Sequence, residues 1–194
     1  MLIEYTRITE PAFSVHVLHS VAYLHSMKSL WLIRHAKSSW SLNDLHDSLR
    51  PLNERGYRDA ENMSARLKSS GTQPDLIVTS FAVRAYSTAV IFARQFGYPT
   101  QHIKIVDCLY ESTTNDYLKT ISELSDKAAT VFLFGHNPII SNTVAILSGS
   151  EGIELPTTGI AKITFKHDTW KLCSERSGKL EVFDYPKSGN QPER

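Results

Sequence analysis

Apolar and polar positions follow two different rhythms along the chain after residue 27. Short apolar runs predict buried strands at 30–33, 75–80, 103–106 and, running on into a loop, 129–138. Between them, apolar residues recur at helical spacing, which predicts helices at about 53–70, 82–97, 116–124 and 139–149. This alternation is typical of an α/β fold, so we expect three layers, with helices on both faces of a mostly parallel central sheet.

The first predicted helix carries the clearest local signals. Asn53 can cap its amino end, and Gly71 follows its carboxyl end. We expect four residues at helical spacing to face the core: Tyr57, Ala60, Met63 and Leu67.

The chain changes character after residue 159. Three segments rich in β-branched and aromatic residues, at 160–165, 169–173 and 179–183, predict extra strands joined by hairpin-like connections. The polar stretch at 186–194 predicts a disordered tail. With no internal repeat or linker in between, we expect a single domain over residues 27–185.

Residues 1–26 are interpreted as a non-catalytic extension that an upstream start would explain. The segment has an apolar centre at 13–24, but His16 and His19 interrupt it. Glu4 and Glu10 precede that centre, where a secretory signal would carry positive charge. The centre is also too short and too polar to span a bilayer. A degenerate export signal is the alternative interpretation.

Charge and cysteine content exclude several classes of protein. Twenty-one basic and twenty acidic residues give a formal charge of +1, whereas a dedicated nucleic-acid binder usually has a strong basic surplus. Cys108 and Cys173 are far apart and form no CxxC pair, so neither a structural zinc site nor a disulfide framework is expected. A reducing compartment is then the default, and we predict a cytoplasmic protein without membrane contact.

Three of the four strands in the alternating region end in polar groups. The first ends in Arg34-His35, the second ends in Thr79-Ser80 with Arg84 one helical turn further on, and the fourth ends in Gly135-His136-Asn137. Because ligands bind beyond the carboxyl ends of parallel strands, we expect two arginines and two histidines to converge at one edge of the sheet.

This combination suits a phosphoryl group. Arginine matches phosphate oxygens with two parallel N–H groups, and a helix starting near Asn137 would add the positive end of its dipole. A histidine among arginines has its charged form disfavoured, so it keeps the free lone pair that a nucleophile needs.

Other interpretations of the same residues are less consistent with the pattern. A histidine near a strand end is often only a structural hydrogen-bonding group. Arg34 and Arg84 would crowd a zinc ion with positive charge. A Ser-His-Asp triad of the hydrolase type would want a G-x-S-x-G elbow, which the sequence lacks.

The segment "LIRHAKSSW" resembles the signature of the histidine phosphatase (phosphoglycerate-mutase-like) superfamily, and in particular the SixA-like phosphohistidine phosphatases. The resemblance continues, in order, through "RPLNERGYRDA", "PDLIVTSFAVRAYSTA", "LYES", "VFLFGHNP" and "LPTTGIAKI". It covers about residues 28–185, and it implies a phosphoglycerate-mutase-like fold.

The resemblance also implies a mechanism without a metal or other cofactor. His35 would attack phosphorus and become phosphorylated, while Arg34, Arg84 and His136 would bind the phosphoryl oxygens. Glu111 would be either a proton donor to the leaving group or a residue that orients the rim. The implied substrate-binding residues are Arg50, Asn137, Lys37 and Ser41.

Three positions depart from the pattern of this branch. Phe81 stands where Ser-Pro is common, and Ser41 follows Trp40 where Asp is frequent. Asp47 is separated from Arg50 by two residues, whereas the usual motif places Asp directly before Arg. These departures concern the rim of the pocket and the choice of substrate.

The implied substrate is a phosphohistidine protein or a small phosphorylated compound, and short connections between the elements leave no room for a large cap domain. A non-catalytic phosphate-binding module stays open as another class of function. A mutase is a weaker alternative, because it would need a longer lid to protect the intermediate from water. We expect a monomer or weak dimer.

Overall fold

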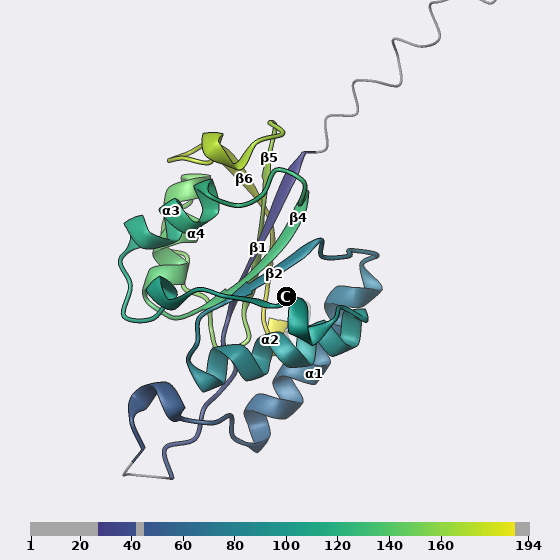
Figure 1. Ribbon diagram of the computed structural model, residues 1–194, viewed down its shortest axis with the longest axis vertical. Helices are drawn as coiled ribbons and strands as arrows, with labels where there is room; N and C mark the ends of the chain where they lie inside the picture. Colours follow the sequence, from purple (N-terminus) through teal and green to yellow (C-terminus); the bar gives the residue numbers. More distant parts are fainter. Residues whose placement is uncertain (1–26, 42–44, 189–194) are drawn as a thin grey trace, which may run out of the picture.

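The computed structural model describes residues 27–41 and 45–188, and the expected extension at 1–26 lies outside this part of the chain. The order of the main helices and strands agrees with the predicted alternation up to residue 149 (Figure 1). The main elements are β1 (Lys28–Arg34), α1 (Glu54–Ser69), β2 (Leu76–Thr79), α2 (Val83–Phe96), β3 (Lys104–Ile105), α3 (Thr114–Ser122), β4 (Thr130–Gly135), α4 (Ile139–Ser148), β5 (Ile160–Phe165) and β6 (Gly178–Asp184).

One six-stranded sheet, in the order β3-β2-β4-β1-β5-β6, forms the centre of the molecule. The pairs β1–β4, β4–β2 and β2–β3 are parallel, whereas β5 and β6 extend the sheet in antiparallel fashion. The expected mostly parallel sheet with added C-terminal strands is therefore confirmed. Because β1, β2 and β4 run in the same direction, their carboxyl ends meet at one edge.

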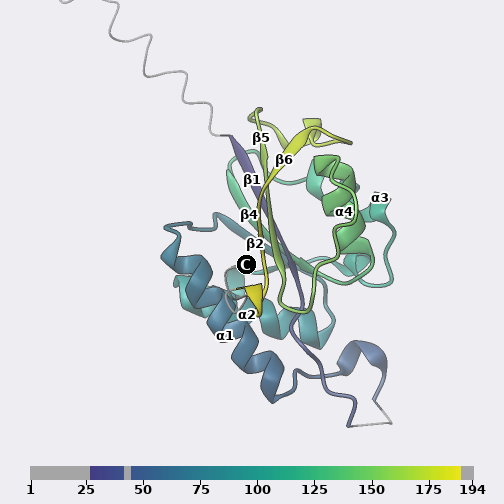
Figure 2. The ribbon, with the colours of Figure 1, turned by 180° about the vertical axis from the view of Figure 1, so that it is seen from behind.

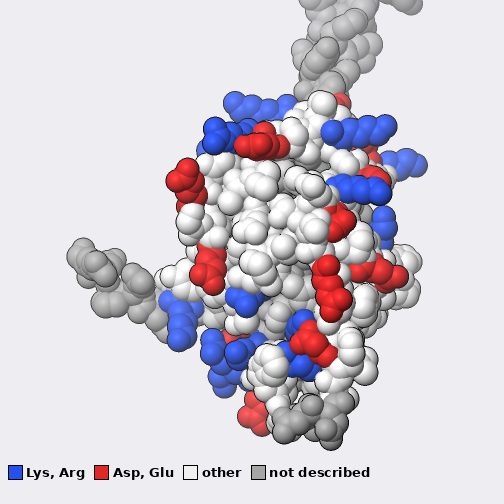
Figure 3. Space-filling view, turned by 90° about the vertical axis from the view of Figure 1, so that its left-hand side faces the viewer, with Lys and Arg blue, Asp and Glu red and all other residues white. Residues whose placement is uncertain are grey.

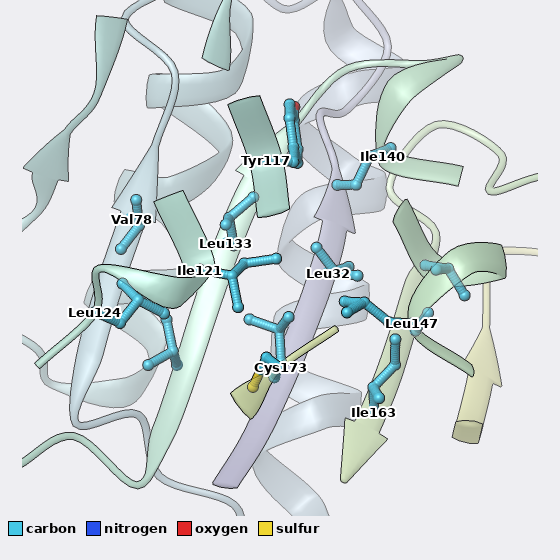
Figure 4. Close-up of a cluster of buried hydrophobic side chains, with 14 of the residues drawn as sticks. Leu32, Val78, Tyr117, Ile121, Leu124, Leu133, Ile140, Leu147, Ile163 and Cys173 are labelled. Atoms are coloured by element: carbon cyan, nitrogen blue, oxygen red, sulfur yellow. The ribbon is translucent and has the colours of Figure 1, made fainter. Parts of the chain in front are cut away.

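Helices cover the sheet on both sides, with α1 and α2 on one face and α3 and α4 on the other (Figures 1 and 2). Successive side chains of β1 alternate between the two cores. Leu30 and Leu32 pack toward α3 and α4, whereas Trp31 and Ile33 pack toward α1 and α2. Figure 4 shows Leu32 in the first of these cores together with Tyr117 of α3. Burial on both faces explains why this strand is an unbroken apolar run.

Helix ends follow the local signals in the sequence. The Asn53 side chain accepts a hydrogen bond from the Gly56 N–H at 2.8 Å and caps α1. Gly97 and Gly149 end α2 and α4 in the left-handed conformation, which glycine adopts without steric cost. These ends determine where the chain turns back toward the edge of the sheet.

The prediction of a strand at 169–173 was wrong. Trp170–Leu172 form a turn of 3-10 helix. The Trp170 ring is fully buried and donates through Nε1 to Ala128 O at 2.9 Å, while its backbone N–H donates to Asp126 Oδ1 at 2.8 Å. The aromatic residue that suggested a strand instead anchors this turn in the core that also contains Tyr117 and Ile121 of α3.

Two smaller expectations also changed. Tyr57, predicted to face the core from α1, has 46% of its surface exposed, whereas Ala60, Met63 and Leu67 are buried as predicted. At the C-terminus, residues 186–188 form a turn in which the Ser188 N–H donates to Tyr185 O at 3.0 Å. The rest of the predicted tail, at 189–194, lies outside the described residues.

Charged side chains of both signs are mixed on the surface. On the face in Figure 3, Lys and Arg alternate with Asp and Glu around a mostly uncharged centre. This agrees with the near-zero formal charge of the sequence. No helix of the described chain has the length and apolar character that crossing a membrane requires.

Candidate active site

Arg34 and His35 leave the sheet at the carboxyl end of β1. The preceding residues 30–33 are buried, so the strand itself cannot shift without disturbing both cores. The Arg34 N–H donates to Gly159 O and the His35 N–H donates to Gly135 O, each at 3.0 Å. The backbone of this pair is thus fixed from both sides, by β4 and by the segment that leads into β5.

One hydrogen bond selects the tautomer of His35. Its Nδ1 lies 2.8 Å from Ala36 O, and since a carbonyl oxygen only accepts, Nδ1 carries the proton. The Nε2 of the neutral ring therefore has the free lone pair. Burial, the nearby His136 ring and the charges of Arg84 and Arg34 lower the pKa of His35 to about 3, although the bond to Ala36 opposes this effect. His35 is neutral at physiological pH.

His136 follows β4 and lies against His35, with 5.0 Å between the ring centroids. Its backbone N–H donates to the Tyr117 hydroxyl at 3.1 Å, and its Nε2 lies 3.0 Å from Ser80 Oγ at the end of β2. Its Nδ1 is buried and has no hydrogen-bond partner within the described chain. Burial, together with Arg84, lowers the pKa of His136 to about 4, so this ring is neutral as well.

Arg84, in the first turn of α2, reaches across to the 3-10 helix Asp47–Leu49. It donates through Nη1 to Asp47 O at 2.6 Å and through Nη2 to Asp47 Oδ2 at 2.8 Å. The same carboxylate accepts from Arg50 Nη1 at 2.8 Å and from the Tyr110 hydroxyl at 2.9 Å. Partial desolvation opposes ionisation of Asp47, but the bonds from Arg50, Tyr110 and Arg84 outweigh it and lower its pKa to about 2.

Arg50 is buried at the base of the rim, with 8% of its surface exposed. Besides Asp47, its guanidinium donates to Ser39 O at 3.0 Å and to Ser38 Oγ at 2.9 Å, and it stacks on the Trp40 ring. These contacts connect Arg50 to the loop that follows His35. The stacked, multiply bonded geometry needs the planar guanidinium of arginine, which lysine cannot supply.

The segment 155–159 passes beside the end of β1. Arg34 Nη1 donates to Leu155 O at 2.8 Å, whereas Arg34 Nε is buried without a hydrogen-bond partner among the residues described. Burial lowers the pKa of Arg34. The Thr158 N–H lies 3.2 Å from both Arg34 O and His35 O. Thr158 has a positive φ of 63°, which is unusual for a β-branched residue and marks a strained backbone at this point.

Two cavities adjoin Arg34. The smaller, of about 170 Å³, is lined by Arg34, His35, Lys37, Ser38, Trp40, Arg50 and Thr157. The larger, of about 510 Å³, extends from Arg34 along the start of α4 and past Asn137 to Glu154. The smaller cavity combines His35 with three cationic side chains, which is the chemistry that an anionic group requires.

The predicted residues fall into three groups. His35, Arg34, Arg84 and His136 come together at the expected edge of the sheet, and Lys37 and Arg50 line the same pocket as His35. Asn137 lines the larger cavity, and its amide donates to Leu155 O and accepts from Ser141 Oγ. Ser41 and Glu111 are exposed; Ser41 bonds to Ser39, and Glu111 adopts a positive φ of 49°.

Sequence reasoning gave no role to four members of the site: Asp47, Ser80, Tyr110 and Thr158. Asp47 stands out in the sequence only through its spacing from Arg50, and Ser80 only as a polar residue at the end of a strand. The spacing of Asp47 and Arg50 did carry a usable signal, because residues three apart share one side of a helical turn. Tyr110 and Ser80 gave no such signal, since their partners are distant in the sequence.

Metal-binding side chains are not grouped in the described residues. Nowhere in that part of the chain do three or more His, Cys, Asp or Glu side chains converge as a metal site would need. The side chains gathered around His35 are mainly cations and neutral imidazoles. Such a set can bind an anion, and His35 adds a nucleophile.

The sequence pattern of the histidine phosphatase superfamily, branch 1, matches residues 30–129, which is more than half of the chain. The chain belongs to this superfamily. An uncharacterised chloroplastic protein of Arabidopsis thaliana is 31% identical over 173 residues, covering 83% of this chain and 79% of the relative. Membership supports a hydrolase that acts on phosphoryl groups.

Solved structures with the same fold include phosphatases of two kinds. A SixA phosphohistidine phosphatase candidate of Agrobacterium tumefaciens superposes with a TM-score of 0.68 at 27% identity, covering 82% of this chain and 98% of that one. A mycobacterial glucosyl-3-phosphoglycerate phosphatase has a TM-score of 0.61 at 16% identity, with 82% and 99% covered. The second likeness shows the fold alone.

Proposed function

We propose that this histidine phosphatase transfers a phosphoryl group from its substrate to Nε2 of His35 and then to water, without a metal ion. The observation that carries the proposal is the bond between His35 Nδ1 and Ala36 O. It leaves the Nε2 lone pair free in a ring whose pKa is lowered to about 3. An unprotonated imidazole beside a cationic pocket is a competent nucleophile for phosphorus.

In the first step, the Nε2 lone pair forms a bond to phosphorus while the bond from phosphorus to the leaving group breaks. The leaving atom keeps the bonding electron pair. The phosphorylated His35 ring retains its proton on Nδ1, and this N–H donates a hydrogen bond to Ala36 O. In the second step, water attacks phosphorus, the P–N bond breaks, and Nε2 regains its lone pair as inorganic phosphate and a proton are released.

Arg34, Arg84 and His136 bind the phosphoryl oxygens in this proposal. Arg34 has an unpartnered Nε–H for the purpose, and His136 has an unpartnered Nδ1. Nδ1 of His136 carries the single proton of the neutral ring if the Ser80 hydroxyl donates its hydrogen bond to Nε2. That direction is favoured because Ser80 Oγ also accepts the Ala82 N–H at 3.3 Å. A neutral imidazole can thus donate to a phosphoryl oxygen in the transition state.

The substrate that we propose is phosphohistidine carried by another protein. The cavity beside His35 is small, and the exposed ring of Trp40 lines it. Two further exposed apolar side chains, Leu49 and Phe81, belong to the segments that carry Asp47 and Arg84. An apolar rim favours contact with a protein surface over contact with a free sugar phosphate. A phosphohistidine substrate protonated on its second ring nitrogen leaves as a neutral imidazole, so it makes little demand on an enzyme acid.

Glu111, Lys37, Arg50, Asn137 and Ser41 complete the proposed site. Glu111 would protonate the leaving oxygen of phosphate esters, and the other four would bind the rest of the substrate. We further propose a cytoplasmic monomer or weak dimer. The second candidate function is hydrolysis of a small phosphorylated compound, because one protein of similar fold is named a glucosyl-3-phosphoglycerate phosphatase.

The test compares hydrolysis of a phosphohistidine peptide, an aryl phosphate, a sugar phosphate and phosphoaspartate, all in the presence of EDTA. We expect turnover to persist with the chelator, to be fastest with phosphohistidine, and to vanish in the His35→Ala variant. Acid-labile label on the wild-type chain after rapid quenching would identify the intermediate. Loss of turnover with EDTA, or full activity of His35→Ala, would contradict the proposal, and phosphate binding without turnover would indicate a binding module.

A further inference from the structure

Asp47 lies at the centre of a cluster of hydrogen-bond donors at the pocket rim. Its carboxylate accepts from Arg50 Nη1 and from Arg84 Nη2, each at 2.8 Å, and from the Tyr110 hydroxyl at 2.9 Å. Its backbone oxygen accepts from Arg84 Nη1 at 2.6 Å. One residue therefore connects two guanidinium groups that come from different parts of the chain.

The contact uses only one edge of the Arg84 guanidinium. Asp47 binds the edge formed by Nη1 and Nη2, through its backbone oxygen and Oδ2. A guanidinium has a second edge, formed by Nε and the other hydrogen of Nη2, which also matches two oxygens of a phosphoryl group. Asp47 thus does not occupy that second edge, and its two bonds fix the orientation of the guanidinium group.

Burial makes this arrangement necessary. The side chains of Arg50 and Arg84 are each only 9% exposed, so their like charges are poorly screened by solvent. The carboxylate between them is 47% exposed and offsets their repulsion. Without it, the two cations would separate or turn toward water, and Arg84 would lose its direction.

We propose that Asp47 is a positioning residue that orients Arg84 for the phosphoryl group and thereby strengthens anion binding by the site. The inference rests on the proposed use of Arg84 as a phosphoryl ligand, and it adds a residue to which no role in that function has been given. Tyr110 stabilises the same arrangement, because its hydroxyl donates a hydrogen bond to Oδ2 of Asp47. The Tyr110 ring in turn contacts the rings of Phe81 and His136.

The charge of Asp47 also has an effect that opposes anion binding. A negative charge beside an anion site repels the ligand, so its removal normally tightens binding. At Asp47 the charge is already neutralised by two arginines, and its contacts to Arg84 lie on the edge that the ligand does not need. Loss of orientation therefore outweighs the relief of repulsion, and the two effects predict opposite signs.

The experiment measures the dissociation constant of inorganic phosphate by titration calorimetry on the full chain. We expect Asp47→Asn to weaken binding about tenfold, since it removes a charge-assisted bond and keeps the side-chain size. The matched control is Glu154→Gln, which removes an exposed charge that acts on Arg34 at longer range. In the control we expect unchanged or tighter binding.

A double-mutant cycle separates positioning from general damage to the structure. In an Arg84→Ala background, Asp47→Asn should change phosphate binding by less than about twofold, because the residue through which Asp47 acts is gone. Tighter binding in Asp47→Asn, no change, or an equal loss in both backgrounds would overturn the proposal. If Asp47→Asn does not fold, Tyr110→Phe tests the same contact and should weaken binding by a smaller factor in the same direction.

Measuring phosphate binding and substrate turnover separately distinguishes failure of the Asp47 proposal from failure of the proposed phosphatase activity. A wild-type chain that binds phosphate but hydrolyses none of the test substrates would contradict the proposed phosphatase and leave the role of Asp47 standing. If the wild-type chain hydrolyses its substrate but the Asp47→Asn variant binds phosphate as tightly as wild type, the role of Asp47 is contradicted and the proposed phosphatase stands.

Discussion

The imidazole rings of His35 and His136 lie 5.0 Å apart, at the ends of two neighbouring parallel strands. Both rings are largely buried beside arginines, and the pKa values are lowered to about 3 for His35 and about 4 for His136. Folding therefore excludes protons from two groups that bind them readily in the unfolded chain. This relationship affects stability as well as chemistry.

Stability should fall as the pH is lowered from about 6.5 to 4. In this window the unfolded histidines, with ordinary pKa values near 6.5, bind protons that His35 and His136 in the folded chain do not. The effect is on the order of 1.4 kcal/mol for each unit by which a pKa is lowered. Asp47, whose pKa is lowered to about 2, contributes stability that is lost only below about pH 4.

Urea unfolding at several pH values between 4 and 8 measures this dependence. In the His136→Gln variant, the free energy of unfolding should depend less steeply on pH between 6.5 and 4. The variant lacks one of the two histidines whose pKa is lowered by folding. An equal slope in the variant would contradict the assignment.

Ser80→Ala should lower kcat/KM about tenfold. The change removes the hydroxyl 3.0 Å from His136 Nε2 and leaves that buried nitrogen without its partner. The proton on His136 would then no longer be held on Nδ1. Nitrogen-15 NMR of the imidazole reports the tautomer directly, and it should change in this variant.

The matched control is Ser64→Ala, which removes another fully buried serine hydroxyl. That hydroxyl donates to Glu61 O within α1, away from the site. We expect wild-type activity and an unaltered His136 spectrum in the control. A normal spectrum in Ser80→Ala would remove the basis of the tautomer assignment.

Gly135→Ala should destabilise the fold by about 1–3 kcal/mol through overpacking. A Cβ at this position would overlap the hydroxyl and the ring of Tyr117, which is fully buried. The same hydroxyl accepts the His136 N–H, so activity should fall as well. Thermal unfolding and kcat/KM measure the two effects.

The double variant Gly135→Ala, Tyr117→Phe tests the cause. Removing the hydroxyl relieves the closest overlap, so the two changes together should cost less stability than the sum of the single changes. If the stability losses of the two single variants simply add in the double variant, the added Cβ destabilises the fold through contacts other than the Tyr117 hydroxyl.

Glu111→Gln should distinguish the two candidate roles of this exposed carboxylate. If Glu111 donates a proton to the leaving oxygen, kcat for an alkyl phosphate should fall about a hundredfold, while phosphohistidine hydrolysis should change little. The measurement is a comparison of kcat across leaving groups of increasing basicity. An equal, small loss for all substrates would instead favour an orienting role at the rim.

Much of the fold could be predicted because burial imposes a pattern on the sequence. The run at 30–33 is apolar on both strand faces because both faces of β1 are buried, and α1 begins and ends near its predicted residues. The segment at 169–173 misled the prediction, since its tryptophan suggested a strand but packs into the core from a 3-10 turn. Local composition cannot distinguish these two ways of burying an aromatic ring.

The convergence of Arg34, His35, Arg84 and His136 also followed from the sequence, because parallel strands place their carboxyl ends at one edge. The roles of these residues stay predictions until the variants above are measured. The contacts that organise them could not be foreseen. Asp47 accepts from Arg84 and Tyr110, and Ser80 contacts His136, across long separations in the chain.

The sequence by itself determined the order of elements up to residue 149, the mostly parallel sheet and the chemical types gathered at its edge. Hydrophobic periodicity is a local property, and strands joined through helices pair in parallel. Only the tertiary structure decided which nitrogen of His35 is free, which edge of Arg84 is available and which carboxylate orients it. These depend on hydrogen bonds, whose distances and angles exist only once distant segments have packed together.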